Sequence, residues 1–204
     1  MRQGAKRVRV TEPLEAGEFR ALMLELPHKM RVIGIVAATT GLRISEVLGL
    51  KWMDIDWRAL QMEVTRSVVD GIVGKCKTEA SRRPVPIDQF TVQTLLEWKK
   101  ETCYAQPEDW VFASEKVQGK MPPWTDTLLD RFLQPAAKRA GIAKWVGFHT
   151  FRHTYSTLLR ACLRSWDGIS VLSKKRDALG MLGAVIVEYE ATKAVFERHR
   201  PGAV

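Results

Sequence analysis

Hydrophobic positions in the first part of the chain repeat with the period of a helix. Apolar residues at i, i+3, i+4 and i+7 within residues 14–26 predict an amphipathic helix that ends at Pro27. Residues 30–40 are apolar on nearly all sides, which predicts a buried helix with Gly41 as its C-terminal cap. A short third helix is predicted over residues 44–49.

The pattern changes to a period of two in the middle of the chain. Apolar and polar residues alternate over residues 60–65, as in a half-buried strand. The pair Asp70-Gly71 is typical of a hairpin turn with a returning strand after it. Residues 75–81 are polar and predict a loop or a second hairpin tip. Residues 83–87 predict an edge strand, because prolines are tolerated at the edge of a sheet.

Helical patterns return in the second half. They predict helices over residues 88–100, 126–140 and 149–160, with Asp126 or Thr127 as the cap of the second. There is no internal repeat and no low-complexity linker. The sequence therefore predicts one compact domain, mainly α with a small antiparallel β-sheet (α+β).

Composition and charge narrow the class of protein. The 204 residues carry a net charge of +9 and the pI is about 9.7, which is typical of a domain that binds a polyanion such as nucleic acid. From charge alone, a basic surface without function is the alternative. The three cysteines lack a C-x-x-C spacing, and apolar runs such as residues 181–187 are too short to span a membrane. We therefore expect a cytoplasmic protein with free thiols and no membrane partner.

Four basic side chains are candidates for binding an anion. They are Arg43, Lys77, His149 and Arg152. Arg43 lies three residues before Glu46, so a carboxylate on the same helical face can orient its guanidinium group. His149 and Arg152 have the same spacing and point the same way from one helix. Each feature alone has an ordinary explanation: a surface Arg–Glu pair, a chance H-x-x-R and a solvated basic loop around Lys77.

Three segments in order resemble the catalytic domain of the tyrosine recombinases, the phage integrase family. They are TTGLRISEVLGLKWMDIDW, GKCKTEASRRPVPI and FHTFRHTYSTLL. The resemblance extends to the DWVF segment at residues 109–112 and to the helix around residues 132–141, and it covers about residues 10–163.

The resemblance implies a role for each candidate. Arg43 and Arg152 would clamp the non-bridging oxygens of the scissile phosphate, which gain negative charge in the transition state. His149 would hydrogen-bond the phosphate or assist proton transfer, and Lys77 would protonate the departing 5′-hydroxyl. It also implies double-stranded DNA as partner, self-association on DNA, and a tyrosine nucleophile that forms a 3′-phosphotyrosyl link. No cofactor and no metal is expected, and the sequence holds no Walker loop, D-x-D-x-D-G or H-E-x-x-H.

The C-terminal segment does not match the family pattern. The family's second His or Trp has its nearest counterpart in the LGM segment at residues 179–181, and Trp166 comes too early to replace it. Tyr189 follows, whereas Tyr104 and Tyr155 lie before and inside the H-x-x-R helix. Two explanations remain: a degenerate or frameshifted tail that has lost the nucleophile, or a divergent tail in which Tyr189 serves. Carboxylates on both sides of Tyr189 would raise its pKa, and they favour the first.

The predicted organisation is an integrase-like catalytic domain over residues 1–163, a divergent or frameshifted tail over residues 164–204, and no N-terminal core-binding domain. The expected function is that of a site-specific recombinase catalytic domain, inactivated if the tail has lost the nucleophile. A non-enzymatic DNA-binding remnant of an integrase is the main alternative, and a type IB topoisomerase-like enzyme is another. A competent tyrosine separates the recombinase from the remnant.

Overall fold

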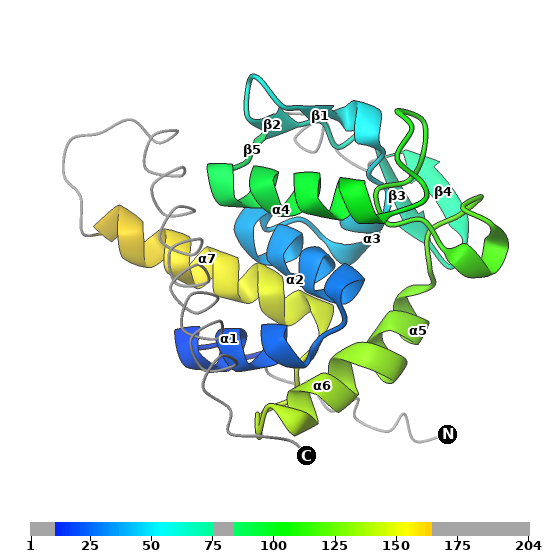
Figure 1. The fold of residues 1–204 in the computed structure, drawn as a ribbon. Helices are drawn as coiled ribbons and strands as arrows, with labels where there is room; N and C mark the ends of the chain where they lie inside the picture. Colours follow the sequence, from blue (N-terminus) through cyan, green and yellow to red (C-terminus); the bar gives the residue numbers. More distant parts are fainter. Residues whose placement is uncertain (1–10, 76–83, 165–204) are drawn as a thin grey trace, which may run out of the picture.

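The computed structural model describes residues 11–75 and 84–164 (Figure 1). Its α-helices are α1 (Ala16–Glu25), α2 (His28–Thr40), α3 (Ile44–Leu48), α4 (Gln89–Glu101), α5 (Thr125–Leu128), α6 (Gln134–Arg139) and α7 (Phe148–Arg164). Its strands are β1 (Ile55–Asp56), β2 (Gln61–Met62), β3 (Arg66–Val69), β4 (Ile72–Lys75) and β5 (Val85–Pro86). Two 3₁₀ turns, η1 (Trp52–Asp54) and η3 (Glu115–Val117), and the π-helical segment η4 (Leu129–Leu133) complete the described elements. The predicted class, mainly α with small antiparallel sheets, is confirmed.

Helix α2 is the centre of the core. Helix α7 crosses it on one side, α4 packs along another, and α3 and α1 also contact it (Figure 1). Its residues are buried from Met30 to Thr40 except Arg31, because a helix that is apolar on all sides has to be covered all round. The prediction of a buried helix over residues 30–40 is therefore confirmed.

The ends of α2 and α4 are closed by local hydrogen bonds. Gly41 follows α2 with φ +68°, and its N–H donates to the Ala37 carbonyl at 3.0 Å, which makes it the predicted cap. Helix α4 begins after Asp88, whose Oδ1 accepts the Thr91 N–H at 2.9 Å. The buried Thr91 hydroxyl also donates to the Thr39 hydroxyl at 2.9 Å, which ties α4 to the last turn of α2.

The strands pair differently from the prediction. Only β2 forms within residues 60–65, and it lies between β1 and β5 in one antiparallel sheet. The alternation continues past β2 because Met62 and Val64 are both buried with an exposed residue between them, so it reports burial rather than pairing. The predicted edge strand is β5.

The predicted hairpin turn is confirmed. Asp70 and Gly71 have φ of 50° and 76°, the left-handed values that two-residue hairpin turns require. They connect β3 to β4, which form a second antiparallel sheet with Val68 opposite Val73. The pattern did not predict β3 as the partner strand.

The predicted cap of the helix over residues 126–140 is wrong. The helix begins at Thr125, and Trp124 stands at the cap position without a side-chain hydrogen bond. Asp126 instead lies inside the first turn, where a negative charge interacts favourably with the helix dipole.

This helix is also interrupted, which the sequence pattern did not predict. Between α5 and α6 the turns widen to the π-helical segment η4, in which the Gln134 N–H donates to the Leu129 carbonyl. Pro135 follows directly; it has no N–H and its ring excludes the carbonyl of Arg131, four residues earlier. A wider turn accommodates this proline without ending the helix.

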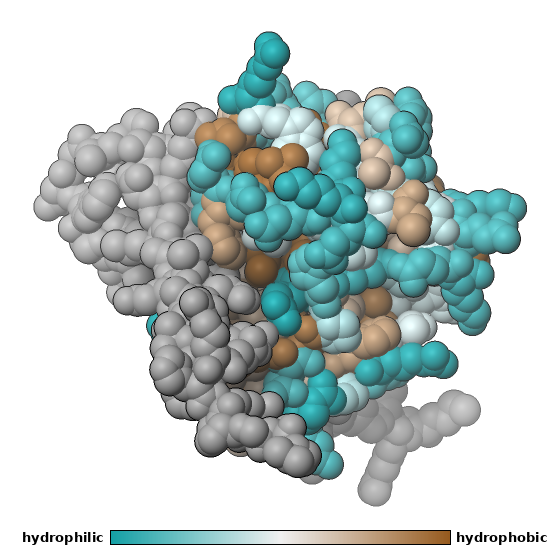
Figure 2. Space-filling view, viewed as in Figure 1, coloured by the Kyte–Doolittle hydropathy of each residue, from teal (hydrophilic) through white to brown (hydrophobic). Residues whose placement is uncertain are grey.

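Helix α7 packs against both α2 and α1. Phe151 lies edge-on against Phe19 of α1, with ring centroids 6.1 Å apart. Among the described helices, none is both long and apolar enough to cross a bilayer. On the face shown in Figure 2, hydrophilic side chains surround separate apolar areas of the described part.

Candidate active site

The C-terminal end of α2 is where distant basic residues meet. Here the guanidinium Nη1 of Arg152 in α7 donates a hydrogen bond to the Gly41 carbonyl. The two residues are 111 positions apart in the sequence. Because Arg43 follows Gly41 by two residues, this contact brings both predicted arginines to one end of α2.

Arg43 is held at the start of α3 by one carboxylate. The Arg43 N–H donates to Glu46 Oε2 at 2.8 Å, and its guanidinium Nη1 lies 3.1 Å from Glu46 Oε1. The side chain of Glu46 is 9% exposed and that of Arg43 is 58% exposed. Glu46 therefore anchors Arg43, while more than half of the Arg43 side chain is exposed and accessible to an anion. The predicted contact between the Arg43 guanidinium group and the Glu46 carboxylate is confirmed.

His149 is exposed on the first turn of α7 and stands beside a second histidine. The ring centroids of His149 and His153 are 5.1 Å apart, with the planes at 75°. Partial burial, and then the positive charges of His153, Arg152 and Arg43, lower the pKa of His149 below its ordinary value. The imidazole is therefore mainly neutral at pH 7, and one nitrogen can donate while the other accepts.

Together these side chains form what we call the cationic cluster: Arg43, His149 and Arg152. His149 and Arg152 are one turn apart in α7, and the hydrogen bond from Arg152 to the Gly41 carbonyl brings them to the segment that carries Arg43. Two guanidinium groups present forked donors that match the oxygens of a phosphate or carboxylate. The cluster is suited to binding a phosphate-like anion.

Several predicted or considered residues lie elsewhere. Lys77 and Tyr189 lie outside the described residues. Tyr104 packs beside the small buried cluster of Val68, Trp110 and Ala113. Tyr155 is part of the site region, because its ring lies on Gly41.

Sequence reasoning missed an ion pair that supports the site region. Arg66 at the start of β3 donates to Asp54 Oδ2 at 2.6 Å and Oδ1 at 3.2 Å, and Nη1 also reaches the Gly49 carbonyl at 3.3 Å. Asp54 is buried, so the charge requires this partner. The pair ties η1 to the β3–β4 hairpin, and the contact with the Gly49 carbonyl ties the end of α3 to the same hairpin. The acidic Asp54 within an apolar stretch was the sequence signal for the pair. Sequence reasoning also missed His153 beside His149, and the H-x-x-x-H spacing, which puts both on one helical face, could have indicated it.

Residues 11–75 and 84–164 hold no group of three or more His, Cys, Asp or Glu side chains arranged to bind a metal ion.

Comparison with known proteins identifies the family. Residues 14–162 match the phage integrase family. The chain is 29% identical to the ICEBs1 integrase of Bacillus subtilis (strain 168) over 161 residues, which are 76% of this chain and 44% of that protein. It is 28% identical to the prophage integrase IntR of Escherichia coli (strain K12) over 167 residues, covering 72% of this chain and 40% of IntR. The chain thus spans less than half the length of these relatives.

Solved structures agree on the fold. The Tn1549 transposon integrase in complex with circular intermediate DNA has a TM-score of 0.64 at 18% identity, covering 95% of this chain and 68% of that one. The XerA recombinase has a TM-score of 0.58 at 21% identity, covering 98% and 67%. With the family match over residues 14–162, these likenesses lead to one conclusion: the chain belongs to the phage integrase family.

Proposed function

We propose that this chain binds duplex DNA as the phosphate-binding part of a site-specific recombinase catalytic domain. The observation that supports it best is the hydrogen bond from Arg152 to the Gly41 carbonyl, which gathers the cationic cluster from two distant segments. Membership of the phage integrase family also supports it. So do relatives whose structures were solved with DNA, the Tn1549 transposon integrase and lambda integrase.

In this proposal the cationic cluster holds the scissile phosphodiester. Arg43 and Arg152 donate to its non-bridging oxygens, and they stabilise the charge that develops there during strand transfer. His149, neutral at pH 7 because of its lowered pKa, donates a hydrogen bond to the phosphate or assists proton transfer during the reaction. Lys77 is proposed from the family resemblance as the acid that protonates the departing 5′-oxygen.

The nucleophile decides between an enzyme and a binding protein. In a working recombinase a tyrosine oxygen bonds to phosphorus while the bond to the 5′-oxygen breaks, and rejoining reverses both changes. Tyr189 is the candidate. Glu188 and Glu190 flank it in the sequence and disfavour its phenolate form. This observation favours the second candidate function, a DNA-binding remnant without strand cleavage.

We further propose self-association on DNA and a cytoplasmic location. A lambda integrase dimer bound to a core site is among the solved structures with this fold, with a TM-score of 0.51. The three cysteines without C-x-x-C spacing fit a reducing compartment.

The deciding experiment is covalent trapping. A nicked suicide substrate lets the cut end diffuse away, so any phosphotyrosyl intermediate persists and appears as a shifted band on a denaturing gel. Because of the flanking carboxylates, we expect DNA binding with little or no covalent band.

Other outcomes of the trapping experiment have defined meanings. A band that disappears in Tyr189→Phe would establish a working recombinase. A band that survives Tyr189→Phe would assign the nucleophile to another tyrosine. Relaxation of supercoiled DNA without a paired site would favour the topoisomerase-like alternative, and failure to bind duplex DNA at low salt would refute the proposal as a whole.

A further inference from the structure

The ring of Tyr155 lies directly on Gly41. A Cβ atom built on Gly41 would stand 2.3 Å from Cδ1 and 2.6 Å from Cε1 of Tyr155, closer than any side chain tolerates. Gly41 also has φ +68°, where residues with a side chain are strained. The tyrosine ring therefore occupies space that only a glycine leaves open.

Two side chains of α7 thus contact the same residue, Gly41. Arg152 donates to the Gly41 carbonyl, and Tyr155, three positions further and on the same helical face, covers the Gly41 Cα side. The segment that follows is equally constrained, since Leu42 is buried and Arg43 is bound by Glu46 at both its N–H and its guanidinium group. Gly41 is therefore the point at which α7 is set relative to Arg43.

We propose that Tyr155 is a positioning residue: its ring, seated on Gly41, sets the placement of the Arg152 guanidinium relative to that of Arg43. Tyr155 acts through packing and not as a nucleophile. Burial raises the pKa of its hydroxyl to about 12, which opposes formation of a phenolate. The inference deepens the proposed function and rests on it for the identity of the anion, while the packing itself does not depend on DNA.

A purely structural role for Tyr155 makes a different prediction. In that case its removal lowers the free energy of unfolding but leaves the cationic cluster as it was in the molecules that remain folded. A positioning role changes the surroundings of His149 in the folded state, because partial burial and the charges of His153, Arg152 and Arg43 together lower its pKa.

The test is the titration of His149 in the full chain, followed by NMR of its ring protons. In Tyr155→Ala the ring no longer seats α7 on Gly41, so Arg152 is less firmly placed and becomes more hydrated. Its influence on His149 then weakens, and the pKa of His149 rises toward its ordinary value. Tyr155→Phe keeps the ring, so the pKa of His149 should stay at its wild-type value. Ile55→Val, a core change in β1 away from α7, lowers stability without moving the pKa of His149, which separates positioning from general destabilisation.

A second readout is the affinity for a short duplex DNA at low salt. We expect a loss of about 10-fold in Tyr155→Ala, the size of one charge-assisted hydrogen bond, and full recovery in Tyr155→Phe. If Tyr155→Ala does not fold, Tyr155→Leu replaces the flat ring by a flexible apolar group, and the same two changes are expected. Unchanged His149 titration in a folded Tyr155→Ala or Tyr155→Leu protein would overturn the proposal.

The contact between ring and glycine has its own test. Gly41→Ala places a methyl group into the Tyr155 ring, and in the Tyr155→Ala background that clash is gone. The two changes should therefore be less harmful together than the sum of their separate effects on unfolding. Simple additivity would contradict the proposed seat. Neither this cycle nor the titration uses DNA. Both can therefore support the positioning role even if the protein does not bind DNA, and both can contradict that role even if it does.

Discussion

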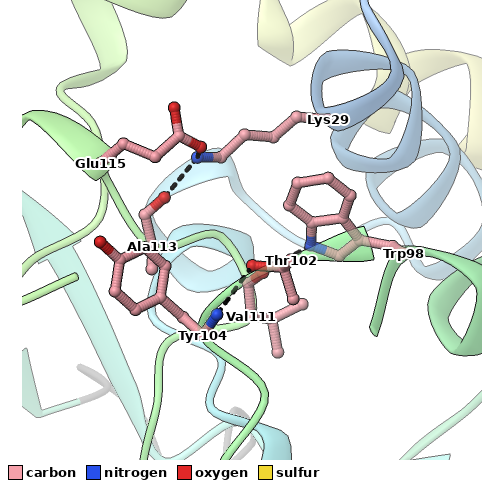
Figure 3. Close-up of polar contacts among 7 residues, drawn as sticks. All are labelled: Lys29, Trp98, Thr102, Tyr104, Val111, Ala113 and Glu115. Atoms are coloured by element: carbon pink, nitrogen blue, oxygen red, sulfur yellow. Dashed lines mark hydrogen bonds and ion pairs between the residues drawn. The ribbon is translucent and has the colours of Figure 1, made fainter. Parts of the chain in front are cut away.

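The basic side chains at the two ends of α2 differ in how far acidic side chains compensate them. At the N-terminal end, His28 Nδ1 lies 2.6 Å from Glu101. The Lys29 ammonium group donates to the Ala113 carbonyl and lies 3.4 Å from Glu115 (Figure 3). The Trp98 ring lies near both side chains. His28 and Lys29 therefore each have an acidic partner.

At the C-terminal end the cationic cluster has less compensation. Among the ion pairs within residues 11–75 and 84–164, the one that involves Arg43, His149 or Arg152 is the pair of Arg43 with Glu46. The helix dipole explains part of this arrangement: its negative end favours Arg152 at the Gly41 carbonyl, whereas its positive end disfavours Lys29 unless an acid lies beside it. Ion pairs at the N-terminal end join α2 to its neighbours, and the less compensated charge at the C-terminal end is available for an anion.

The salt dependence of DNA binding has the largest expected effect. If the excess positive charge meets phosphates, affinity falls about 10³–10⁵-fold between roughly 50 and 200 mM salt, for about 6–10 phosphate contacts. A titration of fluorescent duplex DNA measures it. A flat dependence would mean that the +9 charge has no part in binding.

Conservative changes in the cluster come next. Arg43→Lys and Arg152→Lys keep the charge but lose the forked donors, so each should fold normally. Each should weaken DNA binding by about 1.5–3 kcal/mol per lost charge-assisted bond. Arg139→Lys, in the exposed pair with Glu25, is the matched control and should bind like wild type. Unfolding of both cluster variants would instead make the arginines structural.

The opposite end of α2 should respond in stability and not in binding. Lys29→Met removes the contacts to the Ala113 carbonyl and to Glu115, whose side chain is 78% exposed. We expect a loss of about 1–2 kcal/mol in urea unfolding, most of it from the carbonyl contact, since exposed ion pairs contribute little. A loss of DNA affinity comparable to that of Arg43→Lys would break the proposed division between the two ends.

The smallest effect is the pH dependence of stability through His149. Because its folded pKa is lowered, the unfolded chain takes up this proton first as pH falls through the ordinary value of about 6.5. Stability should therefore decline as the pH drops toward the folded pKa, and His149→Gln should remove that part of the slope. His28→Gln, at the compensated end, should leave it in place. Parallel slopes in wild type and His149→Gln would contradict the assignment.

Much of the site depended on local patterns that could be read without a structure. Gly41 after an apolar helix predicts a left-handed cap, and Arg43 with Glu46 three positions later predicts the observed pair. His149 and Arg152 share a face of α7 because three residues make almost one helical turn. The turn at Asp70-Gly71 follows in the same way from the backbone freedom that its type requires.

The errors have a common physical origin. Alternation over residues 60–65 reports which side chains are buried and not which strand is the neighbour, so the pairing of β4 with β3 was missed. The π-helical segment before Pro135 depends on how α5 and α6 continue into one another, and the start of α5 after Trp124 depends on how the preceding loop enters the helix. The pattern of apolar and polar residues along the chain contains no information on these features.

The sequence by itself determined the class of fold, the family resemblance and the identity of the basic residues, because these depend on residue types and on spacings within one or two helical turns. Only the tertiary structure decided that Arg152 reaches the Gly41 carbonyl, 111 positions away, and that Tyr155 lies on the same glycine. Contacts of this kind are set by how α7 packs across α2. That packing depends on the shapes of both helices and on the close approach that Gly34 allows beside Phe151.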